Sequence, residues 1–323
     1  MKLDSTIQST LSAYSSKKSQ IVIESDRLQS LQWRFALATL LAPFIGSIIA
    51  IGLLRLLPIG LMEIGLLVSF YALTFVGITV GFHRYFAHRA FETRPIIKII
   101  FVILGSMAAQ GPLIQWVATH RRHHKYSEQA EDPHSPYIYE SKKLSWLEGL
   151  WHSHIGWMLN SKMTNSTRFA RDLLQDSTIV KLNRFYLVWL ILGLAIPTVL
   201  GGILSWTWVG AINGFLWGGL VRLFLVHHFS WTIGSIAHIF GVRPFNTSDH
   251  SRNNIWIAVP NFGEGWHNNH HAFPNSAMFG LKWWQIDLGG YVIRILELVN
   301  LVWDVKTPTA AMIKAKSKRI AYF

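Results

Sequence analysis

The chain has 323 residues, and only 15% of them are charged, whereas soluble domains carry about 25% charged residues. This deficit, with 50% hydrophobic residues, indicates that much of the surface faces lipid, and the absence of cysteine excludes disulfides, thiolate metal sites and cysteine nucleophiles. The net charge of +13 leaves two classes open, a nucleic-acid binder and a membrane protein with its basic residues on one side.

Four apolar segments are long enough to cross a bilayer, which takes about 20 residues in a helix. They span residues 35–54, 59–82, 185–204 and 209–226. Short turns around Pro58 and at residues 205–207 join them in pairs, so each pair is predicted to form a tight transmembrane hairpin. The predicted fold class is an all-α membrane protein with four transmembrane helices, interfacial helices and a helical cap on one face.

A fifth apolar stretch, residues 96–116, is interrupted by Lys98, Gly105 and Gln110. These residues make it weak as a span, so we predict that it lies in the membrane interface. Every histidine cluster described below then falls on one side of the bilayer.

The basic residues are concentrated in three stretches outside the hairpins. Residues 1–34, 84–181 and 243–319 hold 27 of the 30 lysines and arginines. Cytoplasmic loops are enriched in these residues, so we place the termini and the active site on the cytoplasmic side. Because a nucleic-acid binder would gather them in one stripe, we expect no nucleic-acid partner. The predicted division is a polar segment at 1–34, a membrane domain at 35–305 and a basic tail at 306–323.

Three histidine clusters follow the membrane exits. On a helix, positions i, i+3 and i+4 share a face, so the spacing His-x2-His-His aims several imidazoles at one centre. Imidazole suits iron, copper, nickel and zinc. Eight imidazoles exceed the six ligands of one octahedral ion, and two metals are therefore predicted. The clusters comprise His83 and His88, then His120, His123 and His124, then His267, His270 and His271.

The donor set narrows the choice of metal, and a family resemblance then implies iron. The clusters offer no matched carboxylate base for zinc hydrolysis, whereas an all-nitrogen pair of irons suits oxygen activation. The three clusters, their order and the intervening hairpins resemble the membrane fatty acid desaturases, specifically the acyl-CoA and acyl-lipid Δ9 type. The resemblance covers residues 35–305 and includes EDPHSP at 131–136, GLWHSHIGWML at 149–159 and NFGEGWHNNHHAFP at 261–274.

The resemblance implies two iron ions, O2 as co-substrate and insertion of a cis double bond into a saturated acyl chain. The iron pair carries the chemistry, and no separate protein acid or base is predicted. A ninth ligand, His238, is implied within SIAH. Animal members carry an asparagine four residues earlier, where this chain has Gly234. The implied tunnel for the acyl chain is lined by Gln110, Trp116, Trp151, Trp157 and Trp231.

The carrier of the acyl chain is left open between coenzyme A and a glycerolipid. Lys162 matches one basic phosphate contact of the family. Other polar head-group contacts of the animal acyl-CoA members are replaced here. The sequence HNNHHAFP resembles bacterial and plant members, so a bacterial inner membrane is predicted. The replaced head-group positions are Gly111, Ala118, Thr119 and Ser161.

The sequence has no haem-binding motif and no nucleotide fingerprint. A separate electron donor, a ferredoxin or a small cytochrome, is therefore predicted to dock on the basic face. Two alternatives stay open. One is a related di-iron enzyme that hydroxylates lipids or converts an existing double bond. The other is a histidine-rich metal transporter, which is disfavoured because transporters bind metals near the middle of their spans.

Overall fold

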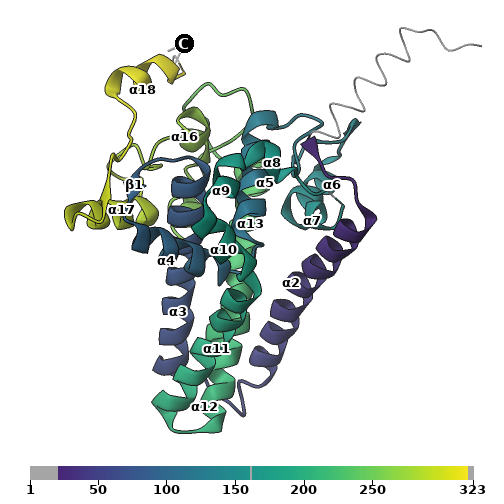
Figure 1. Ribbon diagram of the computed structural model, residues 1–323, viewed down its shortest axis with the longest axis vertical. Helices are drawn as coiled ribbons and strands as arrows, with labels where there is room; N and C mark the ends of the chain where they lie inside the picture. The colour runs from purple at the N-terminus through teal and green to yellow at the C-terminus, as the bar shows by residue number, and fades with distance from the viewer. Residues whose placement is uncertain (1–20, 161, 319–323) are drawn as a thin grey trace, which may run out of the picture.

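The computed structural model describes residues 21–160 and 162–318 and is mostly helical (Figure 1). Four helices are long and apolar enough to cross a membrane, which confirms the predicted fold class. They are α2 (Asp26–Gly52), α3 continued by η1 (Leu61–Val76 and Gly77–Ala87), α11 (Tyr186–Ser205), and a helix formed by α12, η3, α13 and α14 (Trp208–Asn213, Gly214–Val221, Arg222–Gly234 and Ile236–Ile239).

The two helices of the second hairpin approach each other through small residues. A Cβ added to Gly201 would lie 2.2 Å from the carbonyl oxygen of Gly210, and one added to Gly214 would lie 2.2 Å from that of Pro197. Both distances are far below van der Waals contact, so α11 and the fourth span meet this closely only because these positions lack side chains. Such packing contributes much of the attraction between helices in lipid, where the hydrophobic effect does not.

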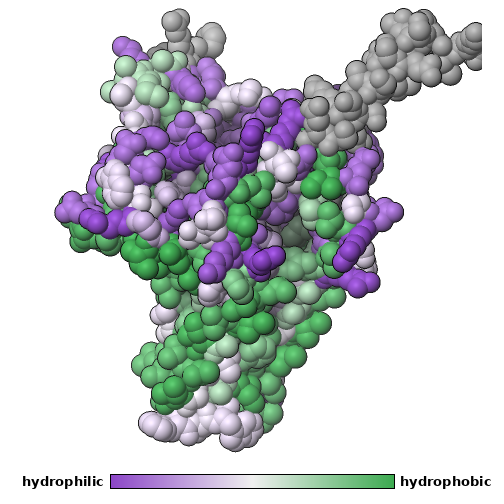
Figure 2. All heavy atoms as spheres, in the orientation of Figure 1, coloured by the Kyte–Doolittle hydropathy of each residue, from purple (hydrophilic) through white to green (hydrophobic). Residues whose placement is uncertain are grey.

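Apolar side chains cover the spans, whereas the opposite end of the molecule, which we call the cap, is largely hydrophilic (Figure 2). Ile48 and Ile51 of α2 and Ile191 and Val199 of α11 are all exposed. Soluble proteins rarely expose a contiguous apolar surface of this extent. Lipid therefore covers these helices, and the chain is a membrane protein.

One arginine lies inside the fourth span. Arg222 is fully buried and donates hydrogen bonds to the carbonyl oxygens of Met107 (2.8 Å), Gly193 (2.6 Å) and Gly218 (3.1 Å). Met107 follows the C-terminal end of a cap helix, where the helix dipole favours a cation. The arginine thus ties this helix end to α11 and the fourth span without a carboxylate among the described residues.

The second and fourth spans continue past their predicted ends, to Ala87 rather than residue 82 and to Ile239 rather than residue 226. Polar residues interrupt the apolar runs there, which is why hydropathy ended the segments early. The continuation matters for function because it carries His83 and His238 into the cap. In the second span the continuing part, η1, has π-helical geometry, which is frequent at functional sites.

Residues 96–116 form α4 and the start of α5 instead of one helix of spanning length, as expected for a stretch that is not a span. The remaining elements of the cap are short. The two small sheets are antiparallel pairs, β1 with β4 and β2 with β3. The cap consists of β1 (Glu92–Thr93), α4 (Pro95–Ser106), α5 (Leu113–Tyr126), β2 (Ile138–Tyr139), β3 (Lys142–Lys143), α6 (Trp146–Trp151), η2 (His152–Gly156), α7 (Trp157–Asn160), α8 (Ser166–Phe169), α9 (Arg171–Gln175), α10 (Ser177–Arg184), α15 (Ile255–Ala258), α16 (His267–Ala272), α17 (Leu288–Leu298), β4 (Val302–Trp303) and α18 (Ala310–Lys316).

A buried ion pair fastens η1 to the C-terminal part of the cap. The two terminal nitrogens of the Arg84 guanidinium donate to the carboxylate of Asp287, at 2.8 and 3.0 Å, and one also donates to the carbonyl oxygen of Ala277. Asp287 in turn accepts from Gly290 N and caps α17. Because Arg84 follows His83 directly, this pair fixes the helix turn that carries a predicted metal ligand.

Candidate metal centre

All nine histidines predicted as metal ligands lie together in the cap, in two adjacent groups. In each group the ring nitrogens lie within 4.8 Å of one another, close enough to hold one ion. The five-histidine group comprises His83, His88, His120, His124 and His270, and the four-histidine group comprises His123, His238, His267 and His271.

Each His-x2-His-His motif serves both groups. On α5, His120 and His124 belong to the five-histidine group and His123 to the other. On α16 the order is reversed, because His267 and His271 point to the four-histidine group while His270 joins the first. Positions i and i+4 thus share one target, and position i+3, rotated around the helix axis, faces the neighbouring one.

The ring nitrogens converge at short distances. His270 Nε2 lies 3.1 Å from His83 Nε2 and 2.9 Å from His124 Nε2. In the other group, His238 Nε2 and His267 Nε2 are 3.1 Å apart. Burial, helped by neighbouring imidazoles, lowers the pKa of His124, His267 and His270 well below its usual value, so these rings are neutral.

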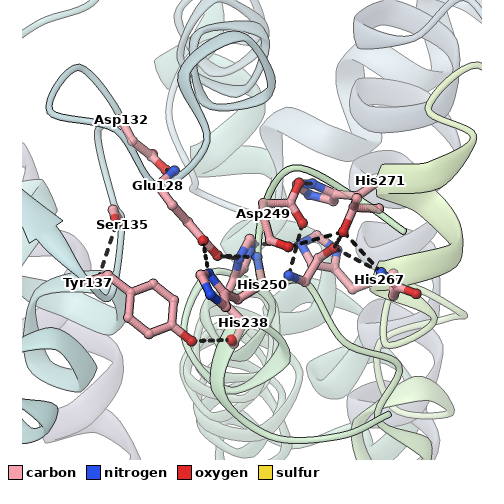
Figure 3. Close-up of polar contacts among 12 residues, drawn as sticks. Glu128, Asp132, Ser135, Tyr137, His238, Asp249, His250, His267 and His271 are labelled. Carbon is pink, nitrogen blue, oxygen red and sulfur yellow. Dashed lines mark hydrogen bonds and ion pairs between the residues drawn. The ribbon is translucent and has the colours of Figure 1, made fainter. Parts of the chain in front are cut away.

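Four carboxylates bond to the outer nitrogens of these histidines. Each contacts an Nδ1 atom and therefore leaves Nε2 with its lone pair directed at the centre. The pairs are Glu264 with His83 (2.6 Å), Asp132 with His123 (2.9 Å), Glu128 with His238 (3.0 Å) and Asp249 with His271 (2.6 Å). Figure 3 shows Glu128 and Asp249 in this arrangement.

The sequence reasoning missed these four acids as a set. Asp132 and Glu264 lie within matched segments, but nothing in the spacing paired them with a particular histidine. Glu128 follows His124 by four residues, yet bonds to His238, which is 110 residues away. Only the three-dimensional arrangement reveals such pairings.

The donor set fits two metal ions. Nδ1 of His83 bonds to the carboxylate of Glu264, so Nε2 of His83 presents a lone pair to His270. A single hydrogen on His270 Nε2 cannot satisfy both His83 and His124. In the other group, His271 Nε2 is buried and has no partner among the described residues. Buried lone pairs that face one another are stabilised by a shared cation, and neutral imidazole is a preferred ligand of iron.

An apolar cavity of about 420 Å³ adjoins both histidine groups. His83 and His120 of the first group and His123 and His267 of the second line it. Four of the predicted tunnel residues line this cavity too, namely Gln110, Trp116, Trp157 and Trp231. The amide of Gln110 donates to Ser230 (2.7 Å) and accepts from Trp116 Nε1 (3.4 Å), so these polar groups are paired.

Trp151 differs from the other predicted tunnel residues. Its side chain is 57% exposed and does not line the cavity, because it lies at the end of α6 and faces outward. The motif around it places Trp157 at the cavity wall instead. The resemblance therefore located the right segment but could not say which tryptophan turns inward.

The predicted head-group positions lie near the cavity. Lys162 lines it and forms an ion pair with Glu24 (2.9 Å) just before α2. Gly111 and Thr119 also line it, whereas Ala118 is fully buried. Ser161 lies outside the described residues. Gly234 leaves a space next to His134, whose Nδ1 would lie 3.3 Å from an added Cβ.

Comparison with known proteins agrees with this geometry. The fatty acid desaturase family matches residues 61–294. The chain is 53% identical to the hex-5-enoyl-[acyl-carrier protein] acetylenase of Moorena producens, over 91% of this chain and 92% of that protein. It is 40% identical to the sn-1 stearoyl-lipid 9-desaturase of Synechocystis sp. (82% and 79%) and to the acyl-CoA C20 Delta5-desaturase of Anemone leveillei (72% and 70%). The chain is therefore a member of the fatty acid desaturase family, an oxidoreductase that acts on fatty acyl chains.

Proposed function

We propose that this protein inserts a cis double bond, at the ninth carbon, into a long saturated acyl chain, using O2 and two iron ions bound by the nine histidines. The observation that supports this most directly is the apolar cavity lined by histidines of both groups. An unactivated methylene has a strong C–H bond, which an acid or base alone cannot break. A redox metal pair beside an apolar cavity meets that requirement.

The iron pair, when bound, would supply the activation of O2 and the removal of two neighbouring hydrogens. The protein supplies the positions. The four carboxylates hold the imidazoles in one tautomer and orientation, which typically matters 10–100-fold for metal affinity or activity. Trp116 and Trp231 confine the acyl chain, so that one carbon pair faces the histidines while water stays out.

The volume of the cavity favours a long chain. At about 420 Å³ the cavity lies in the size range of sites that bury a drug-sized molecule, so it has room for a chain longer than six carbons. A six-carbon chain would leave most of that space empty, which costs packing energy. The ninth carbon follows from the family resemblance and is consistent with the name of the Synechocystis relative.

A second candidate reaction is the conversion of an existing double bond into a triple bond. The specific observation in its favour is the 53% identity with an acetylenase. Both reactions remove two hydrogens from adjacent carbons, so the same histidine groups serve either. The carrier is coenzyme A or a glycerolipid, and the same relative adds acyl-carrier protein as a third possibility.

We further infer that the cap lies on the cytoplasmic side of a bacterial inner membrane. Most lysines and arginines of the described residues lie in the cap, within residues 88–181 and 240–318, and the positive-inside rule favours the cytoplasmic side for such a basic face. On that side, a soluble one-electron donor such as a ferredoxin or a small cytochrome can reach the cap and supply the electrons that O2 reduction consumes.

The test is expression in a host that contains only saturated acyl chains, together with a working electron donor, followed by mass spectrometry of lipids and acyl carriers. The expected product has one cis double bond at the ninth carbon. The mass and bond position separate a desaturase from an acetylenase or a hydroxylase, and the pool that carries the product identifies the carrier. Unchanged acyl chains would refute the proposal.

A further inference from the structure

One of the four carboxylates links a predicted metal ligand directly to the surface. Glu128 accepts from His238 Nδ1 (3.0 Å) with one oxygen and contacts the ring of His250 with the other. The side chain of His238 is 0% exposed, that of Glu128 is 7% exposed and that of His250 is 55% exposed. Figure 3 shows Glu128 between the two imidazoles.

None of the other three carboxylates bonds to an exposed side chain in the part of the chain that the structure describes. Glu264 is enclosed with Arg84, Asp132 is fully buried, and Asp249 bonds inward to His271 and to the amide of Ser251. The four-histidine group thus comes closest to solvent, through bonded side chains, at His250. Because electron-transfer rates fall steeply with distance, His250 is a favourable place for electrons to enter the four-histidine group.

The surface around His250 has the features of a docking site. The ring of Tyr137 packs on His250, with 4.8 Å between centroids, and its hydroxyl donates to the carbonyl oxygen of His238 (2.7 Å). Arg243 and Arg252 lie beside them and are partly exposed. We call Tyr137, Arg243, His250 and Arg252 the entry surface.

The entry surface carries positive charge that the chain itself leaves uncompensated. Arg243 donates to carbonyl oxygens and the hydroxyl of Thr247, and Arg252 donates to the carbonyl oxygen of Gly241 (3.1 Å). Neither guanidinium contacts a carboxylate within residues 21–160 and 162–318. The charge of nearby Glu128 is already shared by two histidines. An acidic partner surface would complete these interactions.

We propose that the entry surface is the docking site for an acidic one-electron carrier protein, which reduces the metal pair by way of His250, Glu128 and His238. In each encounter the carrier loses one electron and the metal pair gains it. No atom is transferred, and the oxidised carrier leaves. This inference rests on the proposed function, since only a redox metal pair needs such a partner.

The test uses an acidic [2Fe–2S] ferredoxin as the probe and the full chain in lipid nanodiscs. Arg252→Glu reverses one charge of the entry surface, and Arg252→Gln removes the charge but keeps a polar side chain. Arg171→Glu is the matched control, because Arg171 is exposed on α9, which packs on α8 and α10 instead. The measurements are the association rate of oxidised ferredoxin at several salt concentrations and the rate at which reduced ferredoxin reduces the iron.

We expect Arg252→Glu to slow association at least about tenfold at low salt and to weaken its salt dependence, with Arg252→Gln in between and Arg171→Glu close to wild type. Reduction by dithionite, which needs no docking, should be equal in all four proteins. Equal ferredoxin association in Arg252→Glu and Arg171→Glu would overturn the proposal. Association is measured without turnover and therefore tests the docking site separately from the reaction. A wild-type protein that binds ferredoxin at this surface but forms no double bond would refute the proposed function and leave the docking site standing.

Discussion

Asp249 offers a graded test of how the carboxylates support the metal centre. It accepts from His271 Nδ1 at 2.6 Å and is buried, so the bond is charge-assisted and shielded from water. Such bonds contribute about 1.5–3 kcal/mol, whereas a neutral hydrogen bond contributes about 0.5–1.5 kcal/mol. Asp249→Ala removes the whole interaction, and Asp249→Asn retains a neutral bond through its amide oxygen.

These energies translate into metal affinity. At 1.4 kcal/mol per factor of ten, Asp249→Ala should weaken one iron site about 10–150-fold, and Asp249→Asn about 5–10-fold. The assay is a competition titration of the iron-loaded protein against a ferrous chelator, with the iron content per chain measured alongside. Asp304→Asn is the matched control, because Asp304 is 61% exposed and forms its ion pair with Lys306 rather than with a histidine.

Glu264→Gln extends the same experiment to the other group, since Glu264 supports His83. It should loosen the ion of the five-histidine group and leave the other in place. The reasoning fails if Asp249→Ala holds both ions as tightly as the wild type, or if Asp304→Asn loses iron to the same extent.

Three further outcomes follow from the structure. His270→Ala should lower the iron content from two ions to one per chain and abolish desaturation, and retained turnover would contradict the ligand assignment. Asp287→Ala leaves Arg84 buried without its partner and should cost about 3–5 kcal/mol, seen as a melting temperature in detergent lower by on the order of 10 °C. Burial acts to raise the pKa of Asp172, but hydrogen bonds, led by that from Arg121, outweigh burial and lower the pKa to about 2. The charged carboxylate therefore stabilises the folded protein above about pH 4, and this stabilisation is lost as the pH falls toward 2. Asp172→Asn should therefore melt below wild type at pH 7, and a difference that did not shrink as the pH falls toward 3 would contradict this.

The sequence predicted those features that depend on local pattern. Apolar runs located the four spans, and the spacing of His120, His123 and His124 placed them on one helix turn. The second and fourth spans were predicted to end too early, because a helix that leaves the membrane keeps its backbone hydrogen bonds while its residues become less apolar. Hydropathy therefore finds the helix in lipid and misses its continuation to His83 and His238.

Pairings between distant segments were beyond the sequence. Asp249 and His271, or Glu128 and His238, meet only because the cap brings loops against helices that are distant in the sequence, and no periodicity encodes these contacts. The direction of a side chain at a loop or helix end is equally hidden. Trp151 and Trp157 occupy one matched segment, yet one faces outward and the other lines the cavity.

The split of each His-x2-His-His motif between the two groups has a consequence for how this scaffold diversifies. Two ions held by these groups would be positioned relative to each other by a single helix turn on α5 and on α16, and that turn is a property of backbone geometry. Substitutions in the cavity wall leave that turn untouched. The metal site can thus stay constant while the residues of the cavity wall change to suit another chain length, carrier or degree of unsaturation. The relatives named above differ in these three respects. New substrate specificities in such enzymes therefore arise from changes in the cavity wall around an unchanged metal site.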